Sequence, residues 1–247
     1  MDYSPRALWR LVELGAHEEV LQSNTFWMCT ACYSCTVRCP RDIPISESMR
    51  ELRELYIQKE IGPLQGGLDA VLSAVDATHN IANEPNETRL IWSENLPERP
   101  TQLELRQAEV LYFIGCVGAL FPQTYGIPQS FVQILGQAGV DYTVLGGEEW
   151  CCGYPVYGAG LKSRVVEMAR HNCERLAETG AKTIVATCPS CYYTWHHLYP
   201  ELLGQPVPAE ILHATEFMAR LIEEGRLSLG PEEDVVTYHD PCDLGRK

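Results

Sequence analysis

The chain has 247 residues, of which 45% are hydrophobic and 21% charged, and its formal net charge is −14 at pH 7. This composition predicts a folded globular protein with one large or two smaller cores. The acidic excess argues against binding to nucleic acid, because phosphates would be repelled. An apolar run of about 18 residues and a signal peptide are both lacking. We therefore expect a cytoplasmic protein, either free or peripheral to a membrane complex, with no transmembrane segment of its own.

Residues 1–80 predict a small, mostly helical module. Ser4 followed by Pro5 is a typical helix start, and apolar residues then recur at helical spacing to about residue 15. The same periodicity predicts three further helices, over residues 17–21, 46–60 and 68–75.

A cysteine run separates the second and third of these helices. Its members Cys29, Cys32, Cys35 and Cys39 are spaced x2, x2 and x3 and are followed by Pro40. Bacterial-type ferredoxins hold [4Fe-4S] clusters with this run, so electron transfer is the leading hypothesis. Zinc is the alternative, but zinc sites usually pair two separated hooks. In two-cluster ferredoxins the fourth cysteine serves the other cluster, so either Cys39 or a residue elsewhere completes the local site.

Residues 81–107 are rich in Asn, Glu, Pro and Thr, and we expect a linker there. Beyond it the pattern changes to short apolar runs, which predict buried strands, separated by helical stretches. The expected strands are 110–114, 142–145 and 183–186, and the expected helices are 128–138, 162–179 and 215–225. This alternation predicts an α/β domain over residues 108–230, with a parallel sheet covered by helices.

Five further cysteines follow the expected strands: Cys116, Cys151, Cys152, Cys188 and Cys191. Ligands of parallel sheets collect beyond the carboxyl ends of the strands, so three loops can bring these five thiols together. The adjacent thiols of Cys151 and Cys152 suit a cluster with several irons, because neighbouring side chains diverge and seldom serve one tetrahedral ion. A zinc site made by Cys116, one of that pair, Cys188 and Cys191 stays open as the alternative.

Residues 231–247 repeat the order of strand, turn and cysteine found around Cys116. A strand is expected from residue 234 to 238, and Cys242 follows it. We interpret this segment as the start of a second, truncated sheet domain, with Cys242 as a metal ligand of a second site. His239 is a candidate for moving protons, and no other catalytic residue is assigned. Cys173 is expected to be an ordinary buried helix residue.

Several of these motifs resemble a known family. The segments around Cys116, Glu149-Trp150-Cys151-Cys152-Gly153, Cys188-Pro189-Ser190-Cys191 and Tyr238-His239-Asp240-Pro241-Cys242 resemble the cysteine-rich CCG domain of the heterodisulfide reductase family. Residues 27–40 resemble that family's ferredoxin-like subunit. The fused order is similar to that of membrane-linked heterodisulfide reductase catalytic subunits and of glycolate oxidase iron-sulfur subunits. The second CCG motif is incomplete and the usual first ferredoxin run is missing, so we expect a fragment of a longer protein or a short homologue.

The resemblance implies a non-cubane [4Fe-4S] cluster held by the five cysteines from Cys116 to Cys191, besides the [4Fe-4S] cluster of the first run. It also implies a subunit of an anaerobic, CoB-CoM heterodisulfide reductase-like oxidoreductase. Such a subunit passes electrons between the two clusters to reduce a disulfide, and its redox partners are flavoprotein or membrane cytochrome subunits. The chain alone is not expected to be competent. Two functions remain as alternatives: an electron-transfer subunit of a flavin-dependent 2-hydroxy acid (glycolate or lactate) dehydrogenase, and a zinc-binding interaction module.

Overall fold

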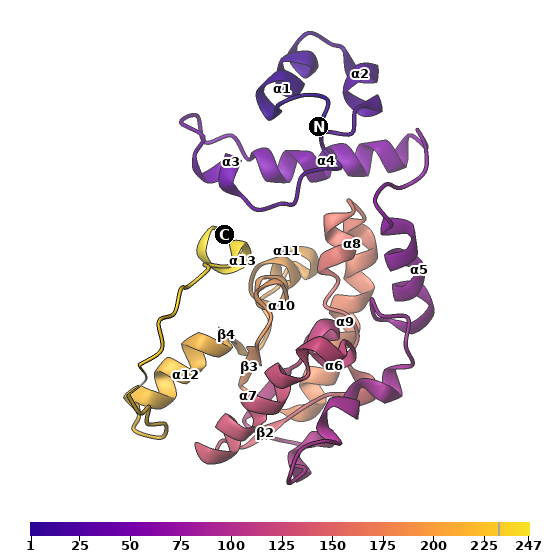
Figure 1. The fold of residues 1–247 in the computed structure, drawn as a ribbon. Helices are drawn as coiled ribbons and strands as arrows, with labels where there is room; N and C mark the ends of the chain where they lie inside the picture. Colours follow the sequence, from indigo (N-terminus) through magenta and orange to yellow (C-terminus); the bar gives the residue numbers. More distant parts are fainter. Residues whose placement is uncertain (232) are drawn as a thin grey trace.

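A parallel sheet with helices on both faces forms the larger part of the molecule (Figure 1), in a computed structural model that describes residues 1–231 and 233–247. The four strands lie in the order β2-β1-β3-β4, and every pairing is parallel. Their bounds are Val110–Phe113 for β1, Tyr142–Thr143 for β2, Thr183–Ala186 for β3 and Glu210–His213 for β4. The expected α/β class, a helical module followed by a parallel-sheet domain, is confirmed.

Four helices form the N-terminal module at the top of the view in Figure 1. Ser4 begins the first of them as expected, because its hydroxyl accepts a hydrogen bond from the backbone N–H of Ala7. The module has a small core of its own, in which Leu8, Phe26 and Met49 are buried. The helices are α1 (Pro5–Glu13), α2 (His17–Gln22), α3 (Ser34–Val37) and α4 (Ile45–Gln58).

Side chains of β1 alternate between two hydrophobic cores, one on each face of the sheet. Leu111 and Phe113 face the core covered by α5 and α9, whereas Val110 and Tyr112 face the core covered by α7 and α12. A strand buried on both faces has a continuous apolar sequence, and this is why β1 could be predicted from the sequence. The covering helices are α5 (Leu68–Thr78), α7 (Gly126–Gln137), α9 (Lys162–Thr179) and α12 (Ala214–Glu223).

Two strand predictions differ from the structure. Strand β4 was missed, because Ile211 and Leu212 are its only apolar residues and too few to form a pattern. The strand expected at residues 234–238 is wrong: no strand is assigned there, and Val235 and Val236 are exposed. In the described residues no neighbouring strand pairs with this segment, and an unpaired strand is not stable in water.

The segment expected to be a linker is folded onto the sheet domain. It contains two 3-10 helices, η1 (Asn86–Ser93) and η2 (Thr101–Leu103), and the side chains of Arg89 and Trp92 are buried. Polar residues stabilise it locally, since the Asn80 amide donates to two backbone carbonyls and to the Asn86 side chain. A polar composition therefore marked a hydrogen-bonded segment here, not a free one.

Helix α4 connects the N-terminal module to the sheet domain through two buried arginines. Arg50 donates to the hydroxyl of Tyr33 at 3.0 Å and to that of Tyr157 at 2.8 Å. Arg53 donates to the carbonyl oxygens of Phe26 and Gly158. Because each arginine bonds to both parts of the chain, α4 holds the two modules against each other.

The remaining helices are short and lie in the connections between the longer elements. They are α6 (Gly115–Leu120), η3 (Pro122–Thr124), η4 (Gly146–Glu148), α8 (Tyr154–Gly158), α10 (Pro189–Tyr193), the π-helix η5 (Thr194–Leu198), α11 (Tyr199–Leu203) and α13 (Cys242–Gly245). Figure 1 shows α13 beside α10, below the N-terminal module. Among the described residues, no helix combines the length and the apolar character needed to cross a bilayer.

Candidate functional site

Five thiols line one cavity beyond the carboxyl ends of β1 and β3. We call it the thiol cavity; it has a volume of about 140 Å³, and its lining includes Cys116, Cys151, Cys152, Cys188 and Cys191. All five cysteines are free, and the Sγ atoms of Cys152 and Cys191 are 3.5 Å apart. The three loops thus meet at one end of the sheet, where the parallel-sheet rule places ligands. Within the described residues, no three His, Cys, Asp or Glu side chains are arranged around one metal-ion position.

Glycines let the three loops approach closely. Gly115 has φ of +78°, and a Cβ atom there would lie 2.9 Å from the Sγ of Cys191. Gly153, directly after Cys152, has φ of +92°, and a Cβ atom would lie 2.6 Å from Val165. Such distances and backbone angles exclude larger residues without strain. The sequence Cys-Cys-Gly is therefore a packing requirement as well as a set of thiols.

The thiols share protons among themselves. Hydrogen bonds with the thiols of Cys151 and Cys191 lower the pKa of Cys152 to about 5. A hydrogen bond with Cys191 lowers the pKa of Cys188 to about 7, whereas the contacts with Cys152 and Cys188 raise the pKa of Cys191 itself. A hydrogen bond with Cys151 and burial raise the pKa of Cys116, so the five thiols differ in how readily they form the thiolate that binds metal.

A buried ion pair lies against the thiol cavity, and its arginine was not among the residues singled out from the sequence. The guanidinium of Arg89 bonds to the carboxylate of Glu149 at 2.8 Å and approaches the Sγ of Cys116 at 3.3 Å. The only local signal is an arginine beside the apolar run from Leu90 to Trp92, which is unusual in a linker. Its partner lies 60 residues further along the chain, so local patterns do not identify the pair.

Three thiols of the N-terminal run line a second cavity, which we call the cysteine-loop cavity. Its volume is about 160 Å³, and Cys29, Cys32 and Cys35 contribute to it together with Met28 and Met49. Cys39 is outside the set of described residues that line it. Hydrogen bonds from the backbone N–H and the hydroxyl of Ser34 lower the pKa of Cys32. The structure thus presents three of the four thiols of the run to one space.

Cys242 lies between the two cavities, in α13. Its Sγ accepts a hydrogen bond from Arg246, whose same nitrogen also donates to the carbonyl oxygen of Cys32. The next residue, Asp243, accepts hydrogen bonds from Ser190 at 2.6 Å and Tyr154 at 2.7 Å, both of which line the thiol cavity. The role of Cys242 as a ligand remains a prediction, but the structure places it next to both cysteine sets.

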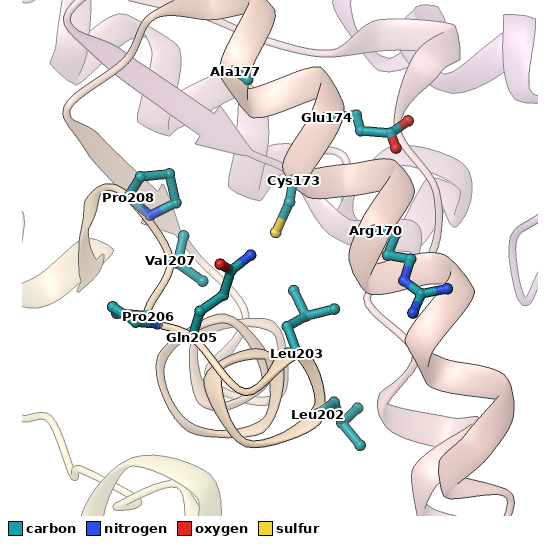
Figure 2. A pocket seen from close by; sticks show the side chains of 10 residues that line it. All are labelled: Arg170, Cys173, Glu174, Ala177, Leu202, Leu203, Gln205, Pro206, Val207 and Pro208. Atoms are coloured by element: carbon teal, nitrogen blue, oxygen red, sulfur yellow. The ribbon is translucent and has the colours of Figure 1, made fainter.

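The candidate His239 and the non-candidate Cys173 are both outside the sets of described residues that line the thiol cavity and the cysteine-loop cavity. His239 is exposed on the surface of the segment before α13. Cys173, which was expected to be an ordinary buried helix residue, is half-buried against the core, and burial raises its pKa to about 11. Its sulfur points into a separate surface groove of about 550 Å³ between α9 and residues 202–208 (Figure 2).

Comparison with known proteins points to iron-sulfur chemistry. Residues 110–195 match the family model described as "CCG: Cysteine-rich domain". One of the subunits of dihydromethanophenazine:CoB–CoM heterodisulfide reductase from Methanosarcina barkeri is 32% identical over 223 residues, which cover 88% of this chain and 52% of that relative. The chain thus spans about half the length of this relative. No solved structure matches the chain significantly.

Two further relatives are named as oxidoreductases. EtfAB:quinone oxidoreductase of Syntrophomonas wolfei is 28% identical, with 92% of this chain and 32% of that protein aligned. The probable iron-sulfur-binding oxidoreductase FadF of Bacillus subtilis is 26% identical over the whole of this chain and 34% of its own length. These likenesses support an iron-sulfur role in electron transfer. Residues 110–195 are therefore similar to the cysteine-rich CCG domain, in a chain that is similar to a heterodisulfide reductase subunit and to an iron-sulfur-binding oxidoreductase.

Proposed function

We propose that this chain binds two iron-sulfur clusters and passes electrons from one to the other. The observation that carries the proposal is the thiol cavity, which gathers five uncrosslinked cysteines from three separate loops. Thiolates are the usual ligands of iron-sulfur clusters. The cysteine-loop cavity of the N-terminal module supplies three more thiols. Both donor sets therefore fit the group by their chemistry.

The proposed ligands are assigned by cavity. Cys29, Cys32 and Cys35 hold a [4Fe-4S] cluster, with Cys39 or another residue as the fourth ligand. A non-cubane [4Fe-4S] cluster is held by Cys116, Cys151, Cys152, Cys188 and Cys191. The clusters supply one-electron chemistry when bound. This chain's own residues hold them, exclude water through the surrounding apolar side chains, and fix their separation through Arg50 and Arg53 of α4.

Disulfide reduction is the reaction we favour for the complete enzyme. A disulfide takes up two electrons and two protons, its S–S bond breaks, and two thiols leave. The name of the Methanosarcina relative states a heterodisulfide as its substrate. The thiol cavity opens beside Tyr154 and Ser190, whose hydroxyl groups are hydrogen-bonded to Asp243. We expect competence to require further subunits or chain segments that donate electrons.

A pure electron relay is the second candidate, in which the chain passes electrons onward and has no substrate of its own. The relative named EtfAB:quinone oxidoreductase favours it, because the name of that protein states a quinone and no disulfide. The subunit of a flavin-dependent 2-hydroxy acid dehydrogenase is one form of this relay. An assay of the reduced full-length protein, together with the subunits that donate electrons to it, against CoB–CoM heterodisulfide separates the two candidates, since only the first predicts turnover.

The first experiment is metal and sulfide analysis of protein purified without oxygen. We expect about eight iron atoms per chain together with acid-labile sulfide. Stoichiometric zinc without sulfide would contradict both redox candidates and support the zinc-binding module. Iron near half the expected value would show that one of the two sites does not hold its cluster.

A further inference from the structure

The ion pair of Arg89 and Glu149 has no part in the function proposed above, yet it lies against a proposed ligand. Both side chains are almost inaccessible, with exposed fractions of 1% and 2%. One guanidinium nitrogen bonds to Glu149 and the other approaches the Sγ of Cys116 at 3.3 Å, within hydrogen-bonding range of sulfur. A positive charge is thus held in a dry environment directly beside one of the five thiols.

Each end of the pair is fixed by further hydrogen bonds. The Nε of Arg89 donates to the side chain of Asn86 at 3.1 Å, and Asn86 is itself held by Asn80. The carboxylate of Glu149 accepts the backbone N–H groups of Ile114 at 3.0 Å and Gly115 at 2.9 Å. Cys116 directly follows Ile114 and Gly115. The ion pair therefore fixes the backbone before Cys116 through Glu149 and the sulfur of Cys116 through Arg89.

Stability alone does not explain a pair of this kind. Desolvating two charges costs free energy, and apolar residues of the same volume often stabilise a core equally well. One terminal nitrogen of Arg89 bonds to the Glu149 carboxylate, and the other is directed at the Sγ of Cys116. The geometry suits a fixed cation that faces a thiolate.

We propose that Arg89 is a positioning residue that orients the Cys116 thiolate and raises the reduction potential of the iron-sulfur group in the thiol cavity. This inference rests on the proposed function. Reduction adds negative charge to the group, and a fixed positive charge stabilises the reduced form more than the oxidised one. An N–H donor to a ligand sulfur acts in the same direction. Glu149 supplies the opposing negative charge and so sets an intermediate potential.

The test uses variants of opposite sign in the whole, anaerobically purified protein. Reductive titration followed by electron paramagnetic resonance measures the potential of each cluster. For Arg89→Gln we expect a more negative potential at the thiol-cavity cluster, and for Glu149→Gln a more positive one. Arg89→Lys keeps the charge and is expected to restore most of the wild-type potential. The N-terminal cluster should be unaffected and serves as the internal reference.

Arg226→Gln is the matched control, because Arg226 bonds to the carbonyls of Ala138 and Gly139 on the same domain, away from the thiols. Equal shifts in the same direction for Arg89→Gln and Glu149→Gln would indicate general damage and overturn the proposal, as would no shift in either. If Arg89→Gln does not fold, the other two variants decide the outcome. A more positive potential in Glu149→Gln, with a potential close to the wild type in Arg89→Lys, supports the proposal. No shift in Glu149→Gln overturns it. A wild-type protein without iron or sulfide would instead refute the proposed function itself.

Discussion

Two glycines decide how closely the cysteine loops approach one another. Gly115 has a left-handed backbone, and it faces the Sγ of Cys191 so closely that only a hydrogen atom fits between them. Gly153 does the same for the loop of Cys151 and Cys152 against α9. The thiol cavity therefore depends on residues without side chains as much as on the cysteines.

Substitution of Gly115 by alanine tests this dependence. We expect Gly115→Ala to destabilise the fold by about 1–2 kcal/mol through backbone strain and to lower the iron content of the thiol cavity. The control is Gly180→Ala, because Gly180 has a similar φ of +62° but no neighbouring atom within 4 Å of a Cβ. Thermal unfolding and iron analysis give the comparison. Equal iron contents in the two variants would show that the contact with Cys191 does not matter.

At the scale of elements, the helix start at α12 carries a buried histidine. The ring of His213 caps the helix by accepting the backbone N–H of Thr215, and its neighbour Thr187 contributes a carbonyl oxygen at 3.3 Å. Burial lowers the pKa of His213 below its usual value of about 6.5. The unfolded chain thus binds this proton more readily, so the free energy of unfolding decreases as the pH falls below about 6.5 and through the lower pKa of the folded state.

Replacement of His213 by asparagine removes this titration while keeping an oxygen acceptor at the cap. Between pH 7.5 and pH 5.5, we expect the wild type to lose more stability than His213→Asn, by up to about 1 kcal/mol. Urea unfolding at the two pH values measures the difference. Parallel losses in the two proteins would mean that other groups govern the acid sensitivity.

Helices and strands with a clear local sequence pattern could be predicted, and those without such a pattern could not. The helix with the Ser4-Pro5 start and the buried strand at Val110–Phe113 follow from local patterns. Strand β4 depends on its neighbour β3 for hydrogen bonds, and its own two apolar residues give no signal. Residues 234–238 have a strand-like pattern, yet in the described structure no partner strand is present for them. Pairing is a tertiary property, which local patterns do not contain.

At the scale of the whole molecule, a general rule of parallel sheets is enough to predict that the five thiols meet. Strands that run in parallel place their following loops at one edge, so Cys116 and Cys188 had to be neighbours. The role of Arg89 could not be predicted, because its partners Glu149 and Cys116 are distant in the sequence. The same applies to Arg53, which joins the two modules through backbone carbonyls and not through a complementary charge.

The measurement that tests the two-cluster account most directly is the iron content of single cysteine variants purified without oxygen. We expect Cys152→Ser to lose about half of the iron and to keep the N-terminal cluster signal. Cys32→Ser should show the converse, and Cys173→Ser, whose thiol lies in the separate groove of Figure 2, should match the wild type. Full iron content in Cys152→Ser, or equal loss in all three variants, would contradict the account.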